Sequence, residues 1–242
     1  MSSIRTIGLT IASVLPGFLK KAVLRRVFGF KIGRGVRIGI SLLDCRQMNI
    51  ADGTTIGHFN LFWRVDRCEI GDNVRIGVGN IFRGGDLIDV GSYCEILRFN
   101  QINAIPDPIL VNKAEPTFHL GAGSVIAASH KIDFTGGVRI GKRVVVGGRL
   151  SSVWTHNRQF AKPVIIGDCV YLGSDVKVAP GVSIPPRCVI GMGSVVASSL
   201  DGHNKLFGGV PARPIKDLDE EGLFLIDSKT RPDLPDSYLQ DS

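Results

Sequence analysis

The chain has 242 residues, enough for one large domain, and combines 30 glycines with few aromatic residues. Its net charge of +7 is uneven, because residues 217–242 carry −6 and therefore leave +13 on the first 216 residues. A basic body suits an anionic ligand, whereas the lack of zinc-finger, RNA-binding aromatic or recognition-helix patterns argues against nucleic acid as a partner. The five cysteines form no CxxC pair, which is typical of buried thiols in a reducing compartment.

Residues 1–31 are predicted to form a short amphipathic helical segment that is broken at Pro16. The apolar stretch at 7–19 is too short to span a bilayer, and no convincing signal-peptide cleavage site follows it. The first acidic residue is Asp44, and eight basic residues precede it. The segment either packs against the body or makes a peripheral contact with a membrane surface, and the sequence leaves both readings open.

From residue 32 onward, an apolar residue recurs every six positions and is usually followed by a small residue or proline. The pattern is clearest at Ile166, Leu172, Val178, Ile184, Ile190 and Val196. A period of six fits neither a helix nor a β-sandwich, but it fits a short strand and a tight corner, three of which close one triangular coil. The predicted coils begin at residues 32, 50, 70, 90, 120, 140, 166 and 184.

Two coils contain long insertions, at about 97–119 and 153–165, and both loops are expected to leave the prism on the same side. The first loop is unusually long for a connector and is a candidate for acceptor specificity. The repeat domain spans 32–216, and the acidic segment 217–242 is predicted to form a helix near 217–225 and then a loose tail.

The repeat, with the runs GDCVYLGSDVKVAPGVSI and GGVPARPIK near its end, resembles the hexapeptide-repeat acyltransferases, especially the maltose, galactoside and polysaccharide O-acetyltransferases. The resemblance covers about 32–216 and implies an all-β fold, a left-handed parallel β-helix of about eight triangular coils. It further implies a cytoplasmic homotrimer that uses acetyl-CoA and no metal. The implied reaction is transfer of the acetyl group to a sugar hydroxyl of a polysaccharide or glycan precursor.

The resemblance implies a histidine general base on a loop before the final coils, and the matching loop, SSVWTHNRQFAKP, carries His156. A histidine titrates near neutral pH, so it can remove the acceptor proton and return it to the departing thiolate. His130 is the alternative and has either an active-site or a structural role. Trp154, Asn157 and Asp133 are candidate acceptor contacts, although Trp154 could equally anchor the loop.

The resemblance also implies that acetyl-CoA lies along the final coils, where small side chains expose backbone groups to its pantetheine arm. An amide of Gly173 or Ser174 would steady the thioester oxygen, and basic residues would approach the phosphates. The candidate cofactor-binding residues are Gly173, Ser174, Gly191, Met192, Arg213 and Lys216.

Three other functions are compatible with a repeat of this kind. An amino-sugar N-acyltransferase would use the same base, but no nucleotide-binding glycine fingerprint precedes residue 32. A zinc enzyme on this fold needs three converging histidines, two of them close in sequence, and here the nearest pair, His119 and His130, is eleven residues apart. A non-catalytic trimeric scaffold would bind no CoA.

Overall fold

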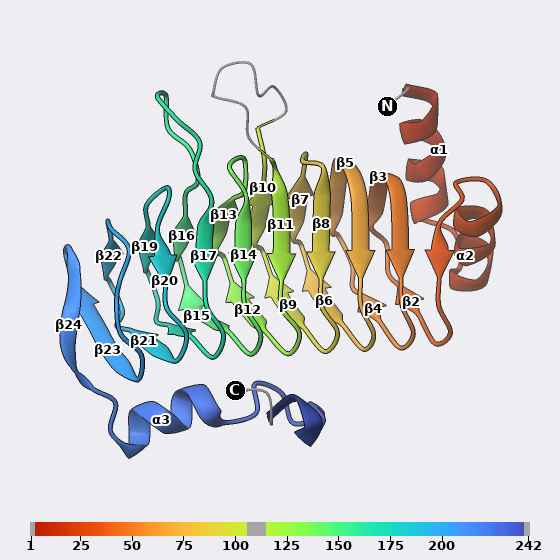
Figure 1. Ribbon diagram of the computed structural model, residues 1–242. Coiled ribbons are helices and arrows are strands. Elements are labelled where there is room, and N and C mark those ends of the chain that lie inside the picture. Colours follow the sequence, from red (N-terminus) through yellow and green to blue (C-terminus); the bar gives the residue numbers. More distant parts are fainter. Residues whose placement is uncertain (1–2, 106–114, 240–242) are drawn as a thin grey trace.

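The computed structural model describes residues 3–105 and 115–239, which form an elongated solenoid of parallel strands with three faces (Figure 1). Short strands separated by corners make each face, because the six-residue repeat turns one apolar side chain per strand into a shared core. The first face contains β1 (Lys31–Ile32), the ends of β3 (Leu42–Ile50) and β5 (Leu61–Ile70), β8 (Leu87–Val90), β11 (Thr117–Leu120), β14 (Val138–Ile140), β17 (Val164–Ile166) and β20 (Ser183–Ile184).

The other two faces are built in the same way. The second face contains β2 (Arg37–Ile38), β4 (Thr55–Ile56), β6 (Arg75–Val78), β9 (Glu95–Arg98), β12 (Val125–Ala128), β15 (Val145–Arg149), β18 (Tyr171–Leu172), β21 (Cys188–Ile190) and β23 (Lys205–Gly209). The third face contains the beginnings of β3 and β5, then β7 (Ile81–Arg83), β10 (Gln101–Asn103), β13 (Lys131–Asp133), β16 (Ser152–Val153), β19 (Lys177–Val178) and β22 (Val195–Val196). β24 (Ala212–Asp217) pairs antiparallel with β23 and ends the solenoid.

The strand register confirms the predicted coils. The eight predicted coil starts stack on one another in register along the first face and are all buried, namely Ile32, Ile50, Ile70, Val90, Leu120, Ile140, Ile166 and Ile184. In Figure 1 the first face descends in front, the chain returns behind it, and the coils advance from right to left. This winding is left-handed, so the fold class is confirmed.

The two insertions leave the same corner of the prism, between the third and first faces, because they follow β10 and β16, which both flank β13 on the third face. The first insertion is shorter than predicted, since β9, β10 and β11 occupy the ends of the range 97–119. It therefore spans 104–116, and its residues 106–114 lie outside the described residues. The second insertion spans 154–163.

Two helices cover the first coil: α1 (Ser3–Ser13) and α2 (Gly17–Arg26), with Pro16 between them. Leu9, Ala12 and Leu24 are buried against the solenoid, and Arg5 donates from Nη2 to the Cys45 carbonyl at 2.9 Å. The helices therefore pack against the body and shield the core at its open end. All five cysteines are free and buried.

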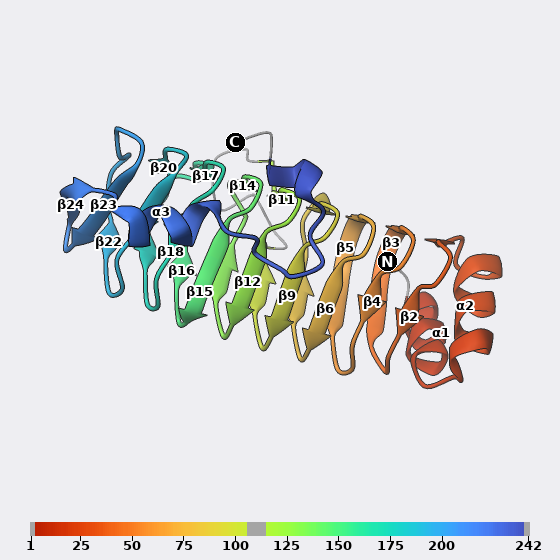
Figure 2. The same ribbon diagram turned by 90° about the horizontal axis from the view of Figure 1, so that it is seen from below.

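The C-terminal segment differs from its prediction. α3 (Glu220–Asp227) begins later than expected because residues 212–217 pair as β24, and Asp219 caps the helix by accepting from the Gly222 amide at 3.0 Å. The following residues, up to the short helix η2 (Asp236–Leu239), lie along the second face (Figure 2). The prediction of a loose tail was wrong for them, because buried Arg231 donates to the carbonyls of Asn73 (2.9 Å) and Cys94 (3.1 Å).

Candidate functional site

His156 lies on a hairpin, residues 154–163, that projects from the corner between the third and first faces (Figure 1). His156 and Ala161 pair as an antiparallel bridge across it. Asn157 closes the tip, because its Oδ1 accepts from the amides of Gln159 (2.7 Å) and Phe160 (3.0 Å). Asn157, which was predicted to contact the acceptor, thus helps to form the turn next to His156.

The imidazole of His156 is held by Asp133, with 2.7 Å between Nδ1 and Oδ2. The Thr135 hydroxyl donates to the other carboxylate oxygen at 2.7 Å, and Thr155 donates to Oδ2 from its amide (3.0 Å) and its hydroxyl (2.7 Å). Burial alone would raise the pKa of Asp133, but the hydrogen bonds from Thr135, Thr155 and His156 bring it below its usual value. An ionised carboxylate only accepts, so Nδ1 carries a proton, and in the neutral form of the ring the lone pair is on Nε2.

Asp133 therefore has a different setting from the one expected of an acceptor contact. The residue is 5% exposed, and both of its carboxylate oxygens accept hydrogen bonds from its own chain. Thr135 and Thr155, which hold the Asp133 carboxylate, were not among the residues predicted from the sequence. The stacking of β13 on β16 pairs Ile132 with Val153 and so places Asp133 beside Trp154, one residue before Thr155 and two before His156. The coil register predicted from the six-residue repeat could therefore have indicated this proximity.

His130 occupies a separate, internal position. The residue is 1% exposed, its amide donates to Asn100 Oδ1 at 2.9 Å, and its Nδ1 accepts from the Ser151 amide at 3.1 Å. Asn60 and Asn80 make equivalent bonds in the preceding coils, so His130 continues a ladder of buried side chains. Burial lowers the pKa of His130 to about 4, which keeps the ring neutral near pH 7. Among the described residues, nothing partners its Nε2.

Trp154 lies at the base of the hairpin. Its amide donates to the Val178 carbonyl at 3.0 Å, which ties the main chain to the next coil. The Lys131 Nζ lies 4.5 Å from the centre of the partly exposed indole ring. The main chain thus anchors the hairpin while the ring remains accessible from solvent.

The candidate cofactor residues gather at the C-terminal end of the solenoid. Gly173 and Gly191 form successive corners after the second face, and a Cβ added to Gly173 would lie 2.8 Å from the Met192 amide nitrogen. The amide of Gly173 donates to the Ile190 carbonyl at 2.9 Å and stabilises the coil stack. Of the two amides expected to steady a thioester oxygen, Ser174 is therefore the remaining candidate.

The two basic candidates lie on β24, beside these corners. Arg213 and Lys216 are exposed, and Lys216 pairs with Asp219. The corners at Gly173 and Gly191 lie at the edge where the third face meets the second, and β24 belongs to the second-face sheet. The His156 hairpin leaves the opposite edge of the third face, where it meets the first. A single chain thus separates the cofactor candidates from His156 by the width of that face.

A cavity of about 400 Å³ lies at the base of the hairpin, between it and Glu115. Its lining includes Ala161, the pairing partner of His156, with Thr117, His119 and Arg139 from the first face. His119 Nδ1 lies 3.1 Å from the Asp89 carboxylate. These polar and charged groups suit a hydroxylated ligand next to the His156 hairpin.

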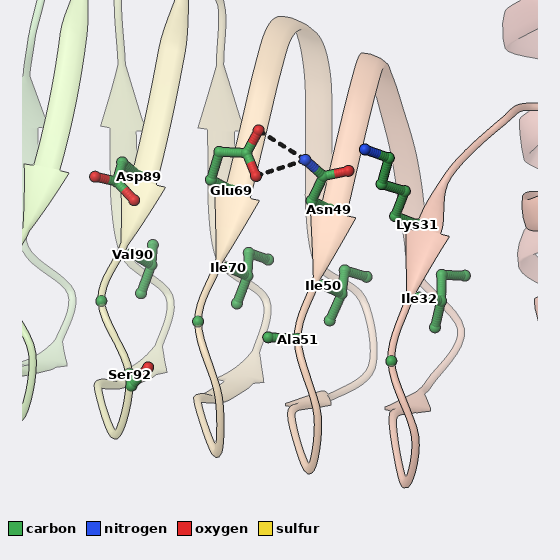
Figure 3. Close-up of a pocket in the computed structure, with 13 residues that line it drawn as sticks. Lys31, Ile32, Asn49, Ile50, Ala51, Glu69, Ile70, Asp89, Val90 and Ser92 are labelled. Carbon is green, nitrogen blue, oxygen red and sulfur yellow. Dashed lines mark hydrogen bonds between the residues drawn. The ribbon is translucent and has the colours of Figure 1, made fainter.

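A larger depression, of about 580 Å³, lies on the first face of the first four coils. Lys31, Asn49, Glu69 and Asp89 form a row across it, and Asn49 donates to both Glu69 carboxylate oxygens at 2.8 and 2.7 Å (Figure 3). Its nearest strand, β8, is three strands from β17, or roughly 14 Å. The cavity at the hairpin is therefore the better acceptor candidate despite its smaller volume.

The described ranges gather no three His, Cys, Asp or Glu side chains in a metal-binding arrangement. No protein-family model matches the chain. Curated relatives include galactoside O-acetyltransferase of Escherichia coli K12, 35% identical over 65 residues (27% of this chain and 32% of the relative). The bifunctional protein GlmU of Pelobacter propionicus is 24% identical over 212 residues, 77% of this chain and 45% of that protein.

Among solved structures, the hexapeptide-repeat acetyltransferase VCA0836 from Vibrio cholerae has 18% identity and a TM-score of 0.39, over 90% of each chain. UDP-N-acetylglucosamine acyltransferase from Campylobacter jejuni has 14% identity and a TM-score of 0.47, over 81% of this chain and 76% of that one. The chain matches about a third of the length of galactoside O-acetyltransferase. The curated matches thus show that parts of the chain are similar to acetyltransferases, and the six-residue repeat that resembles the hexapeptide-repeat acyltransferases builds the solenoid.

Proposed function

We propose that the protein is an acetyl-CoA-dependent O-acetyltransferase that acts on a sugar hydroxyl of a polysaccharide or glycan precursor. The observation that carries the proposal is the His156–Asp133 pair, with 2.7 Å between Nδ1 and Oδ2, on a hairpin beside a polar cavity. The name of the Escherichia coli relative, galactoside O-acetyltransferase, supports a sugar hydroxyl as the acceptor.

In the proposed reaction, Nε2 of His156 removes the proton of the acceptor hydroxyl as its oxygen attacks the thioester carbonyl. The carbon–sulfur bond then breaks, and His156 returns the proton to the CoA thiolate. Asp133 holds the ring through Nδ1 and stabilises the transient imidazolium, so it is a positioning residue. The Ser174 amide is the proposed donor to the thioester oxygen as this gains charge.

We further propose a homotrimer with its active sites between subunits. Gly173 and His156 lie at opposite edges of the third face, so a site that uses both needs a second chain. The cofactor-binding edge of one subunit would then face the hairpin of its neighbour. Five free, buried cysteines suit a reducing compartment, and we place the reaction in the cytoplasm.

The testing experiment measures acceptor-dependent release of CoA thiol from acetyl-CoA over a panel of sugars and amino sugars. The proposal predicts release with a hydroxyl acceptor, near-complete loss in His156→Ala, and retained activity in His130→Asn. Release only with amino sugars would identify an N-acetyltransferase instead. No binding of acetyl-CoA would favour a structural scaffold.

A further inference from the structure

The outer surface of the N-terminal helices carries apolar side chains that do not pack against the rest of the fold. Ile4, Ile7 and Ile11 of α1 are 82%, 61% and 60% exposed. With exposed Val14 they follow a three- and four-residue spacing, so they form one stripe along α1. Burial of Leu9 and Ala12 in the solenoid core turns this stripe outward.

The stripe carries no charge. Arg5 is the only charged residue of α1, and its guanidinium donates to the carbonyls of Cys45 (2.9 Å) and Arg46 (3.3 Å) on the solenoid. Beyond the break at Pro16, Phe18 and Leu19 at the start of α2 are exposed as well. Exposed apolar side chains that gather in this way mark a contact site with a partner or a membrane.

The charge around this surface identifies the partner. Residues 1–43 contain eight basic and no acidic side chains. Exposed basic groups follow the apolar stripe in the chain, on α2 and the first coil: Arg25, Arg26, Lys31, Arg34 and Arg37. Of these groups, Arg34 pairs with Asp52 at 3.0 Å. An uncharged apolar helix face followed by a run of exposed basic groups matches the boundary between acyl chains and anionic headgroups.

We propose that the N-terminal helices, residues 3–26, dock the protein on the surface of an anionic lipid bilayer. No helix in the described part of the chain is long and apolar enough to cross a membrane, so the contact is peripheral. The apolar stripe of α1 enters the headgroup boundary, and the basic residues contact lipid phosphates. This orientation points the long axis of the solenoid away from the bilayer, because the helices occupy one end of it (Figures 1 and 2).

The test is co-sedimentation of the full-length protein with vesicles of phosphatidylglycerol and phosphatidylcholine in equal parts, and with phosphatidylcholine vesicles alone. We expect binding mainly to the anionic vesicles. Ile7→Gln with Ile11→Gln should lower partitioning at least tenfold, because glutamine keeps the helix but not the apolar contact. Arg26→Gln with Lys31→Gln should lower it about 25-fold, at roughly fivefold per basic residue.

Phe224→Gln with Leu225→Gln is the matched control, since these apolar side chains on α3 are also exposed but lie in an acidic segment. The control should bind like the wild type, and circular dichroism should show that every variant is folded. Failure of the wild type to bind anionic vesicles, or binding that survives the Ile7 and Ile11 changes, would overturn the proposal. Dissociation of an oligomer by those changes in sedimentation velocity, without vesicle binding by the wild type, would instead identify an interface between copies.

Discussion

His130 and His156 lie one coil apart and differ in what surrounds the ring. His130 is enclosed by its own coil stack, where burial lowers its pKa to about 4 and Nδ1 accepts from the Ser151 amide. His156 stands on a hairpin with Nδ1 against an ionised carboxylate, and its side chain is 18% exposed. The group next to each ring therefore decides its chemistry. A buried backbone amide gives His130 a structural role, whereas Asp133 orients the ring of His156.

Substitution of the two histidines should give the largest contrast. His156→Ala should lower acetyl transfer by roughly 10²–10⁴-fold, the usual loss for a general base. His130→Asn should stay within a few-fold of the wild type, because asparagine fills the equivalent ladder positions at Asn80 and Asn100. Steady-state kinetics of CoA release measures both. Equal losses in the two variants would contradict the division of roles.

Asp133→Asn should lower kcat by about a hundredfold and leave the affinity for acetyl-CoA unchanged. The amide keeps the volume of the carboxylate but removes the charge that stabilises the imidazolium. Isothermal titration with CoA provides the control for binding. Unchanged kcat would show that the 2.7 Å contact between Asp133 and His156 has no part in catalysis.

The lowered pKa of His130 should make the stability of the protein depend on pH. Its folded-state pKa of about 4 lies below the ordinary value of 6.5, so between these values the unfolded chain binds more protons. The free energy of unfolding should therefore fall by about 3 kcal/mol as the pH drops from 6.5 to 4, and His130→Asn should lack this decrease. Urea titrations across this range measure it. The lowered pKa of Asp133 contributes only at more acidic pH, where its stabilisation is lost as the pH falls below 3.8.

A smaller effect is expected when the hairpin is moved rather than its histidine removed. A Cβ added to Gly136 would lie 2.7 Å from the Thr155 carbonyl oxygen and 2.8 Å from the Lys162 nitrogen. Gly136→Ala should therefore displace the hairpin and lower activity about tenfold. Gly17→Ala is the control, because nothing lies within 4 Å of its added Cβ. Equal activity of both variants would show that the position of the hairpin does not matter.

The solenoid could be predicted almost rung by rung from the sequence. The six-residue period is visible within each coil, so it can be recognised without knowing which distant segments are in contact. The structure accordingly confirms all eight predicted coil starts, from Ile32 to Ile184. Ladder positions carry a similar signal, since Asn60, Asn80, Asn100 and His130 each follow their coil start by ten residues.

Contacts between segments could not be predicted in the same way. The pairing of Asp133 with His156 joins residues 23 apart through the hairpin, and no local pattern encodes it. The C-terminal segment was misjudged because its acidic composition suggests solvation, whereas Arg231 joins Asn73 over 158 residues. The charge composition of a segment does not predict whether that segment packs against the rest of the chain.

In the proposed reaction Asp133 acts only through His156, and a double-mutant cycle on acetyl transfer can distinguish this from an independent role. We would measure the wild type, Asp133→Asn, His156→Ala and the double variant under one set of conditions. We expect Asp133→Asn to cause no further loss once His156 is absent, because the imidazole through which Asp133 acts has gone. Additive losses would contradict it and would give Asp133 a role independent of the imidazole.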